Sequence, residues 1–329
     1  MGSSIQADPL PPAVILSGPT AAGKTAVAEA LSDRFPIRLI SVDSAQVYRG
    51  LDIGSAKPGV VELERYPHAL IDLRWPEESY SAADFVVDAE QAMRRAAADG
   101  RVPMLVGGTV LYLRSLLYGL DRLPEADPAL RQRLRAQAER EGWNKLHQDL
   151  ARRDPETAAR IRPSDPQRIQ RALEVLELTG RGLASHHSAP RRPRFPSLRL
   201  VLTPADRRQL HQRIERRFGQ MLDDGLIEEV EALRQRPGLH DTHPSMRSVG
   251  YRQVWQFLDG GLDRTELMAQ AVAATRQLAK RQLTGLRKLS DALWYDPQRR
   301  QTLTVIARQL SDFRVGTGGR PECRNVVTQ

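Results

Sequence analysis

One octapeptide constrains this chain more than any other feature. It matches the pattern G-x-x-x-x-G-K-S/T and consists of Gly18, Pro19, Thr20, Ala21, Ala22, Gly23, Lys24 and Thr25. The apolar run before it, residues 13–17, predicts a buried parallel strand. Residues 25–35 after it have helical spacing and stop before Pro36. The octapeptide therefore stands between a strand and a helix, which is the context that a phosphate-binding loop requires.

The residue types of this loop suit phosphate binding. Its glycines allow backbone N–H groups to turn toward phosphate oxygens, and the following helix adds the partial positive charge of its N-terminus. Lys24 supplies a full positive charge, and the Thr25 hydroxyl is placed to reach a Mg²⁺ ion. We therefore expect Mg²⁺ as a cofactor, with Thr25 as its protein ligand.

The surrounding pattern predicts the fold class. Further strands are expected at residues 38–42, 102–106 and 198–202, and a helix at residues 81–99. Helices are also expected at about 204–235, 251–259 and 263–285. Strands that alternate with helices indicate an α/β fold, here a P-loop NTPase-like parallel sheet.

The strand–helix alternation stops at about residue 121. From there to residue 196 the sequence predicts helices broken by prolines, so we expect an inserted all-helical domain. Residues 183–197, rich in proline and arginine, are expected to form a mobile or extended basic link. The predicted core is then made of residues 13–120 and 197–314. Residues 1–12 and 315–329 are expected to be a disordered leader and tail.

Charge and composition narrow the function classes. The net charge of +9 favours a polyanionic partner, with nucleic acid first and an anionic membrane surface second. The single cysteine excludes a disulfide framework or a cysteine-based zinc site within one chain and fits a reducing cytoplasm. The chain has no apolar run near the ~20 residues that span a bilayer, so we expect no membrane partner.

One carboxylate is expected at the mouth of the cleft. Asp43 follows the strand at 38–42, whereas the strand at 102–106 ends in Gly107, Gly108 and Thr109 and offers no acid. Ligands of open α/β sheets bind beyond the carboxyl ends of the strands. By position alone, Asp43 is equally a metal ligand, a general base or a helix cap.

Several further motifs occur in a fixed order. DSAQVYRGLDIGSAKP covers residues 43–58 and DPQRIQRALEV covers 165–175. RSVGYRQ covers 247–253 and TRQLAKRQLTGLRK covers 275–288. Together with the phosphate-binding loop and the GGT at 107–109, this set resembles bacterial tRNA dimethylallyltransferases over nearly the whole chain. The chain departs from the family pattern at Gly285, where the family usually has a bulky aromatic residue.

The resemblance implies a reaction and roles for particular residues. The loop at 18–25 and Arg217 would bind the diphosphate of dimethylallyl diphosphate. Asp43 would take a proton from the exocyclic amine of an adenine in tRNA, with Lys24 and Thr109 also in the catalytic site. The implied tRNA-binding residues are Asp43, Ser44, Ala45, Gln46, Thr109, Arg131, Gln167, Arg168, Ile169, Gln170, Arg171, Arg247, Ser248, Val249, Gly250, Tyr251, Arg252, Lys280, Arg281 and Arg287. The insertion would hold the anticodon stem-loop, and we expect a monomer.

Other basic and aromatic residues have a plainer interpretation. A group of arginines on the helix at 204–235 is typical of a solvated helix face: Arg207, Arg208, Arg213, Arg216 and Arg217. The resemblance singles out Arg217 alone. Trp143, Trp255 and Trp294 are expected to be at least partly buried.

Three alternatives to tRNA prenylation stay open. The first is a prenyltransferase that acts on free adenine nucleotide, and the second is a P-loop kinase that uses ATP. The third is a nucleic-acid-binding protein whose phosphate-binding loop only gates binding. The insertion and the basic C-terminal helices favour tRNA over a mononucleotide, which needs no such surface.

Overall fold

The computed structural model describes residues 9–121, 123–186 and 192–315. The chain divides into two compact units: Met1–Leu117 together with Pro193–Gln329, and Tyr118–Arg192. The boundaries expected from the sequence were residues 121 and 196. The first unit is an α/β structure and the second is helical, and the predicted α/β fold class is confirmed.

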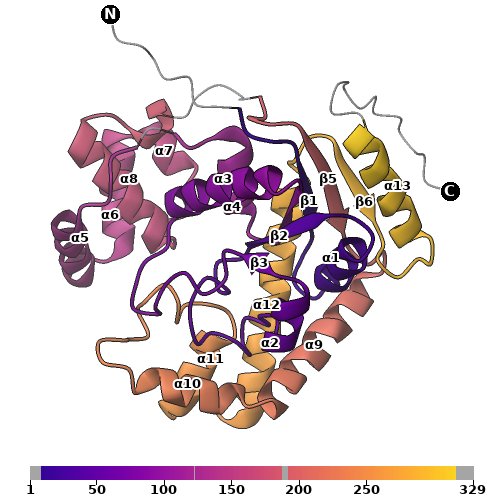
Figure 1. Ribbon diagram of the computed structural model, residues 1–329. Coiled ribbons are helices and arrows are strands. Elements are labelled where there is room, and N and C mark those ends of the chain that lie inside the picture. Colours follow the sequence, from indigo (N-terminus) through magenta and orange to yellow (C-terminus); the bar gives the residue numbers. More distant parts are fainter. Residues whose placement is uncertain (1–8, 122, 187–191, 316–329) are drawn as a thin grey trace, which may run out of the picture. The chain divides into compact units, whose positions relative to one another are not determined.

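A six-stranded parallel sheet forms the middle of the first unit (Figure 1). Its strand order is β3-β2-β4-β1-β5-β6. The strands are β1 (Ala13–Ser17), β2 (Ile37–Val42), β3 (His68–Ala69), β4 (Val102–Gly107), β5 (Ser197–Leu202) and β6 (Ala292–Tyr295). The sequence prediction placed β1, β2, β4 and β5 correctly and missed the short outer strands β3 and β6.

The sheet is buried on both faces. On one face, alternate strand residues pack with Ala28 and Leu31 of α1 (Lys24–Ser32) and with Ile306 and Leu310 of α13 (Thr302–Val315). The strand residues of that cluster include Val14, Leu16, Leu39, Met104, Val106, Leu200 and Leu202. Helix α3 (Ala82–Ala98) contacts β2 and β4 and lies on the other face (Figure 1). Burial on both faces explains why these strands are apolar almost throughout.

The strands that carry the predicted site end side by side. Ser17 of β1 and Val42 of β2 are both register partners of Gly107, the last residue of β4. The Ser17 hydroxyl also donates to the Gly107 carbonyl oxygen at 2.8 Å. The loops that follow β1, β2 and β4 therefore start from one row at the carboxyl edge of the sheet.

The remaining helices of the first unit lie around this edge. They are α2 (Val60–Arg65), α4 (Val110–Tyr118), α9 (Arg207–Asp223), α10 (Leu226–Arg234), α11 (Tyr251–Leu258) and α12 (Arg264–Leu286). The helix predicted at 204–235 is in fact two, because the chain turns at Asp224 and Gly225. Helix α12 packs against both α9 and α11.

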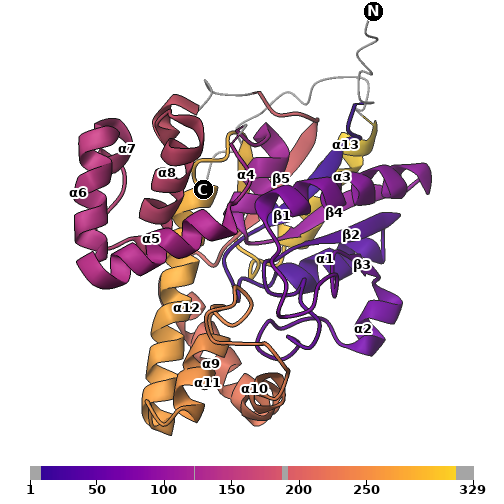
Figure 2. The same cartoon turned by 90° about the vertical axis from the view of Figure 1, so that its left-hand side faces the viewer.

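In the described part of the second unit, most of the α-helices begin with a proline. It contains α5 (Pro128–Glu141), α6 (Trp143–Arg153), α7 (Pro155–Ala159), α8 (Pro166–Thr179) and a 3₁₀ turn at Leu183–His186 (Figure 2). In three of the four helices an aspartate caps the N-terminus and a proline follows it: Asp127, Asp154 and Asp165. This agrees with the expected series of helices broken by prolines: each of these prolines begins a new helix, where it lacks only an N–H that the helix leaves unused.

The ends of the chain differ in part from expectation. Leu10, predicted to belong to a disordered leader, is 7% exposed and lies in the core. Phe195 of the expected link is likewise buried. Residues 1–8, 187–191 and 316–329, which cover the rest of the predicted leader, part of the link and nearly all of the tail, lie outside the described residues. Among the helices that the structure describes, none has the length and apolar character to cross a membrane.

Candidate active site

The loop between β1 and α1 is shaped to receive an anion. Gly23, which precedes α1, has a φ of 89°, and Ala21 has a φ of 61°. The left-handed region strongly favours glycine, which explains Gly23 at this point. The Lys24 ammonium donates to the carbonyl oxygens of Gly18 and Pro19 at 3.0 and 2.9 Å. Lys24 thus lies back across the mouth of its own loop.

Lys24, Arg217 and Asp43 interact electrostatically. Burial lowers the pKa of Lys24 to about 8, even though the Asp43 carboxylate raises it, and the Arg217 guanidinium lowers it further. Burial also lowers the pKa of Arg217, again against the effect of Asp43. Two cations from different elements are therefore held together beside one carboxylate.

Two adjoining cavities lie at this edge of the sheet. The smaller, of about 280 Å³, is lined by Ala21, Gly23, Lys24, Thr25, Arg213 and Arg217. The larger, of about 520 Å³, also includes Ala21 and Arg217, so the two meet there. Three cationic side chains and no acid line the smaller cavity, whereas Asp43 lines the larger one. The predicted residues Thr20, Ser44, Ala45 and Thr109 also line the larger cavity.

The Asp43 carboxylate is oriented by the backbone that follows it. Its Oδ1 accepts from the Ala45 N–H at 2.8 Å and, more weakly, from the Gln46 N–H at 3.4 Å. Thr109 is anchored close by, since its N–H donates to the Val42 carbonyl oxygen at 3.3 Å. Because Oδ1 is occupied by these amides, Oδ2 is the oxygen left for a reacting group.

An aromatic wall closes the larger cavity. Tyr48, Tyr80 and Tyr112 line it and are each less than one-tenth exposed. Tyr112 stacks on Phe85 with ring centroids 4.5 Å apart and meets Tyr80 edge to face. Burial raises the pKa of both Tyr80 and Tyr112, so their hydroxyls stay protonated. The sequence prediction missed these residues. Tyr48 lies in the 43–58 motif, of which only residues 43–46 were assigned a role, and Tyr80 and Tyr112 stand outside the quoted motifs.

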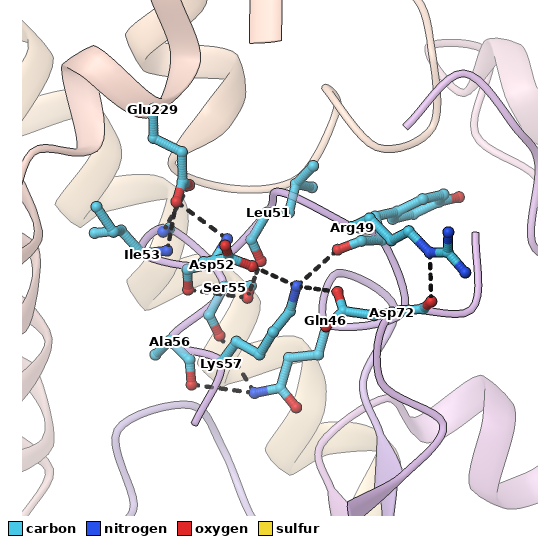
Figure 3. A network of polar contacts seen from close by, with 12 residues as sticks. Gln46, Arg49, Leu51, Asp52, Ile53, Ser55, Ala56, Lys57, Asp72 and Glu229 are labelled. Carbon is cyan, nitrogen blue, oxygen red and sulfur yellow. Dashed lines mark hydrogen bonds and ion pairs between the residues drawn. The ribbon is translucent and has the colours of Figure 1, made fainter. Parts of the chain in front are cut away.

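The loop after β2 is held from inside by Lys57 (Figure 3). The Lys57 side chain is only 4% exposed, and its ammonium forms ion pairs with Asp52 at 2.5 Å and Asp72 at 2.6 Å. It also donates to the Tyr48 carbonyl oxygen at 2.8 Å. The Gln46 side chain, predicted to contact RNA, instead bonds Ser41 and the carbonyl oxygen of Ala56. These contacts fix the loop that carries Tyr48, Gly54 and Ser55 into the cavity wall.

Glu229 of α10 holds the same loop from outside (Figure 3). Its carboxylate accepts from the backbone N–H groups of Asp52, Ile53 and Gly54 at 3.1, 2.7 and 3.3 Å. It also accepts from the Tyr251 hydroxyl at 2.6 Å. One carboxylate thus joins the loop after β2 to the 247–253 motif. Neither Glu229 nor Lys57 was singled out from the sequence.

Helix α12 contacts the phosphate-binding loop directly. The Gln282 side chain accepts from the Thr20 N–H at 2.9 Å, and it lines the larger cavity together with Arg281. The Gly285 position explains the departure from the family pattern: a Cβ there would lie 2.7 Å from Val110 Cγ1. Helix α12 therefore approaches α4 too closely for a bulky side chain at this position.

The comparison with known families decides which kind of protein this is. The family model described as IPP transferase matches residues 46–289. The chain belongs to the IPP transferase family. The matched region holds Thr109, Arg217 and the 247–253 motif, and it begins three residues after Asp43.

Individual relatives agree with the family match. The chain is 56% identical over 288 residues to a tRNA dimethylallyltransferase of Thiobacillus denitrificans, covering 87% of this chain and 92% of that one. It is 52% identical over 313 residues to a tRNA dimethylallyltransferase of Thioalkalivibrio sulfidiphilus, covering 94% and 98%. Among solved structures, the tRNA isopentenylpyrophosphate transferase of Bacillus halodurans is 34% identical, with a TM-score of 0.67 and coverage of 92% and 96%. A eukaryotic dimethylallyltransferase acting on tRNA shares the fold, with a TM-score of 0.76 at 22% identity over 96% and 81% of the chains.

The 247–252 segment and α12 divide into cavity-facing, surface and buried residues. Arg247, Ser248, Val249 and Gly250 line the larger cavity. Arg252, Lys280 and Arg287 are exposed. Tyr251 is 0% exposed, so its side chain, bonded to Glu229, is not available for the predicted RNA contact. The resemblance marks this motif by position and does not distinguish its buried side chains from its exposed ones.

The predicted contacts of the helical unit also separate. Glu174 is fully buried and accepts from Arg131 at 2.8 Å and from Arg171 at 2.5 Å. Burial on its own would raise the pKa of Glu174, but these arginines hold that pKa below its usual range. Ile169 is 0% exposed in the unit's core, which removes its side chain from the predicted RNA contact.

Three other residues complete the predicted set in this unit. Gln170 donates to the Arg131 carbonyl oxygen at 2.9 Å, so its side chain serves the packing of the unit. Gln167 and Arg168 are exposed, and Arg168 pairs with Asp165 of its own helix turn. Of the predicted group, these two have the side chains most accessible to a partner.

The donor set fits a magnesium ion only together with a phosphate ligand. In the described part of the chain, no three His, Cys, Asp or Glu side chains gather to hold a metal. Thr25 lines the cationic cavity, and Asp43 lines the cavity that adjoins it. Mg²⁺ commonly binds one or two protein oxygens, with substrate phosphates and waters completing its octahedron. Thr25 is the residue that would hold it here, together with the phosphates of a bound ligand.

The Glu229 contacts generate a test of loop order. Glu229→Ala leaves three backbone N–H groups and the Tyr251 hydroxyl without their acceptor, which should lower the free energy of unfolding by about 1–3 kcal/mol. Hydrogen exchange at residues 52–54 should accelerate. Glu231→Ala, an exposed site on the same helix, is the control and should change neither measurement. Unchanged exchange at 52–54 in Glu229→Ala would show that the loop does not depend on this carboxylate.

Proposed function

We propose that this chain transfers a dimethylallyl group from dimethylallyl diphosphate to the N6 amine of the adenine adjacent to the anticodon in tRNA, releasing diphosphate. The observation that carries the proposal is the pair of adjoining cavities. One is cationic and without acid, and the other has aromatic walls and the Asp43 carboxylate. The names of the relatives in the IPP transferase family support the same reaction.

The first step is to bind and orient the diphosphate. The loop amides, Lys24 and Arg217 surround the smaller cavity, so the two phosphates bind there with the allylic carbon directed past Arg217 into the larger cavity. As the bond between C1 and the bridging oxygen breaks, the electron pair stays on that oxygen. Preorganised donors and cations stabilise this developing charge most effectively in a site shielded from water. When bound, Mg²⁺ would neutralise part of it.

The second step is the attack of the amine. The N6 nitrogen forms the new bond to C1, and one of its protons must leave. Asp43 Oδ2 is placed to take this proton, because Oδ1 is held by the amides of Ala45 and Gln46. A positioned general base suits an aromatic amine, which is a weak nucleophile.

The larger cavity also suits a base that has left its stack. The rings of Tyr48, Tyr80 and Tyr112 offer apolar surface to a planar base. Extruding an unpaired base from an RNA loop costs only a few kcal/mol. A cavity of about 520 Å³ lies within the usual range for small-molecule sites, roughly 300–1,000 Å³.

We further propose that the helical unit, with Gln167 and Arg168 on its surface, binds the anticodon stem-loop and that the enzyme acts as a monomer in the cytoplasm. The exposed Lys280, Arg281 and Arg287 of the first unit would contact the RNA backbone. Each phosphate contact releases counterions, so tRNA affinity should fall steeply with salt.

The reaction itself separates this function from its rivals. The full chain is incubated with labelled dimethylallyl diphosphate and either tRNA or AMP, without ATP. We expect labelled tRNA and equimolar pyrophosphate, with no product from AMP. Labelled AMP would indicate an enzyme acting on free nucleotide. A requirement for ATP, or release of ADP, would support the kinase alternative. RNA binding without label transfer and without release of pyrophosphate would indicate a binding protein.

Asp43 should be required for turnover but not for tRNA binding. Asp43→Asn keeps an oxygen that accepts from Ala45 but removes the base, and Asp43→Ala removes both. Both variants should lower kcat by about 100-fold or more, the usual contribution of a general base. The Kd for tRNA, measured by filter binding, should change far less. Near-normal kcat in Asp43→Asn would exclude Asp43 as the base.

The lowered pKa of Lys24 predicts a pH dependence of substrate binding. Protonated Lys24 attracts the diphosphate and neutral Lys24 does not, so affinity is greatest below the pKa and falls as pH rises through about 8. The last ionisation of a phosphate ester has a pKa of about 6, so the substrate's own charge is constant in this range. We therefore expect KM for dimethylallyl diphosphate to rise between about pH 7 and 9. Lys24→Arg should flatten this profile. A KM independent of pH in the wild type would contradict the proposed role.

A further inference from the structure

The arginines of α9 separate into two groups. Arg207, Arg208 and Arg216 are exposed, in agreement with the solvated face expected from the sequence. Arg213 and Arg217 are half-buried and lie one helical turn apart. Residues four apart share one side of a helix, so both guanidinium groups leave α9 in the same direction. Both line the smaller cavity at the phosphate-binding loop.

Arg213 reaches the backbone of that loop. A Cβ placed on Gly23 would lie 3.7 Å from Arg213 Nη1, so the guanidinium is close to the last glycine of the loop. Ile214 and Phe218 beside it are buried and fix this side of α9 against the first unit. Arg213 is thus half-buried beside the last glycine of the loop.

No acid accounts for this position. Among the described residues, no ion pair or hydrogen bond is made by Arg213, whereas Arg276 of the neighbouring helix pairs with Glu215. The cavity that Arg213 lines contains Lys24 and Arg217 and no carboxylate. Placing three cationic side chains around one cavity is unfavourable when the nearest carboxylate, Asp43, lines only the adjoining cavity, and an anion bound between the cations would offset this cost.

We propose that Arg213 is a second diphosphate-binding arginine, which grips the substrate together with Arg217 from the side opposite the loop amides. The proposal rests on the function proposed above and adds a binding residue that neither the sequence patterns nor the resemblance single out. Two arginines one turn apart present two planar forks, enough to engage both phosphate groups of a diphosphate.

The test uses inorganic pyrophosphate as the probe and the full chain. Its Kd is measured by calorimetry for the wild type, Arg213→Ala, Arg213→Lys and Arg216→Ala, with KM for dimethylallyl diphosphate and for tRNA measured alongside. We expect Arg213→Ala to raise both the pyrophosphate Kd and the dimethylallyl diphosphate KM by about 10- to 100-fold, as for loss of a charge-assisted hydrogen bond. Arg213→Lys should fall between it and the wild type. Arg216→Ala, the matched exposed neighbour, should stay within about twofold of the wild type.

Two outcomes would overturn the assignment. A pyrophosphate Kd for Arg213→Ala within about twofold of the wild type, in a protein with an unchanged thermal melt, would show that Arg213 does not bind the diphosphate. If that variant instead raised only the KM for tRNA, Arg213 would be an RNA phosphate contact. If the wild-type protein bound pyrophosphate but transferred no prenyl group, the proposed function would be refuted. The assignment of Arg213 as a diphosphate-binding residue would still stand.

Discussion

The parallel pairing of β1 and β2 with β4 is the constraint on which the site depends. Strands β1 and β2, which flank β4, both end at the level of Gly107. Three loops therefore start from one row. The first loop supplies phosphate-binding amides, the second supplies Asp43, and the third supplies Thr109. No single one of these loops supplies all the groups of the site. A register shift of any of the three strands would separate the carboxylate from the anion site, even if every residue stayed the same.

Much of this arrangement could be predicted from local sequence, and the remainder depends on tertiary contacts. The strand–loop–helix context of residues 13–35 and the acid at the end of β2 are local signals, and both led to the correct part of the fold. The prolines of the second unit were local signals too, and the aspartate–proline pairs mark where three of its helices begin. Tyr48, Tyr80 and Tyr112 come together only in the folded chain. Ile169 and Tyr251 show the opposite case, since a motif names positions without saying which side chains are buried.

The two cavities differ in the charge of the side chains that line them. The smaller one is lined by three cationic side chains and, among the described residues, by no acid, and the larger one is lined by the Asp43 carboxylate. Asp43 and the cations moderate each other across the junction, as the opposing influences on the pKa of Lys24 show. The loop after β2, which lines the larger cavity, is held by the buried cation of Lys57 and by the Glu229 carboxylate of α10.

The contact between Gly285 and Val110 ties two distant positions of the chain together. With valine at 110, a Cβ at 285 would meet Cγ1 at 2.7 Å, so an aromatic side chain at 285 requires a different partner on α4. A lineage that enlarges Gly285 first passes through an overpacked intermediate, and one that reduces Val110 first passes through an intermediate with a cavity. The two sites should consequently change together over evolution. The tolerated combinations are a small residue at 285 with a branched residue at 110, and a large residue at 285 with a smaller residue at 110. Grafting the aromatic from a relative into this chain would succeed only as a double substitution.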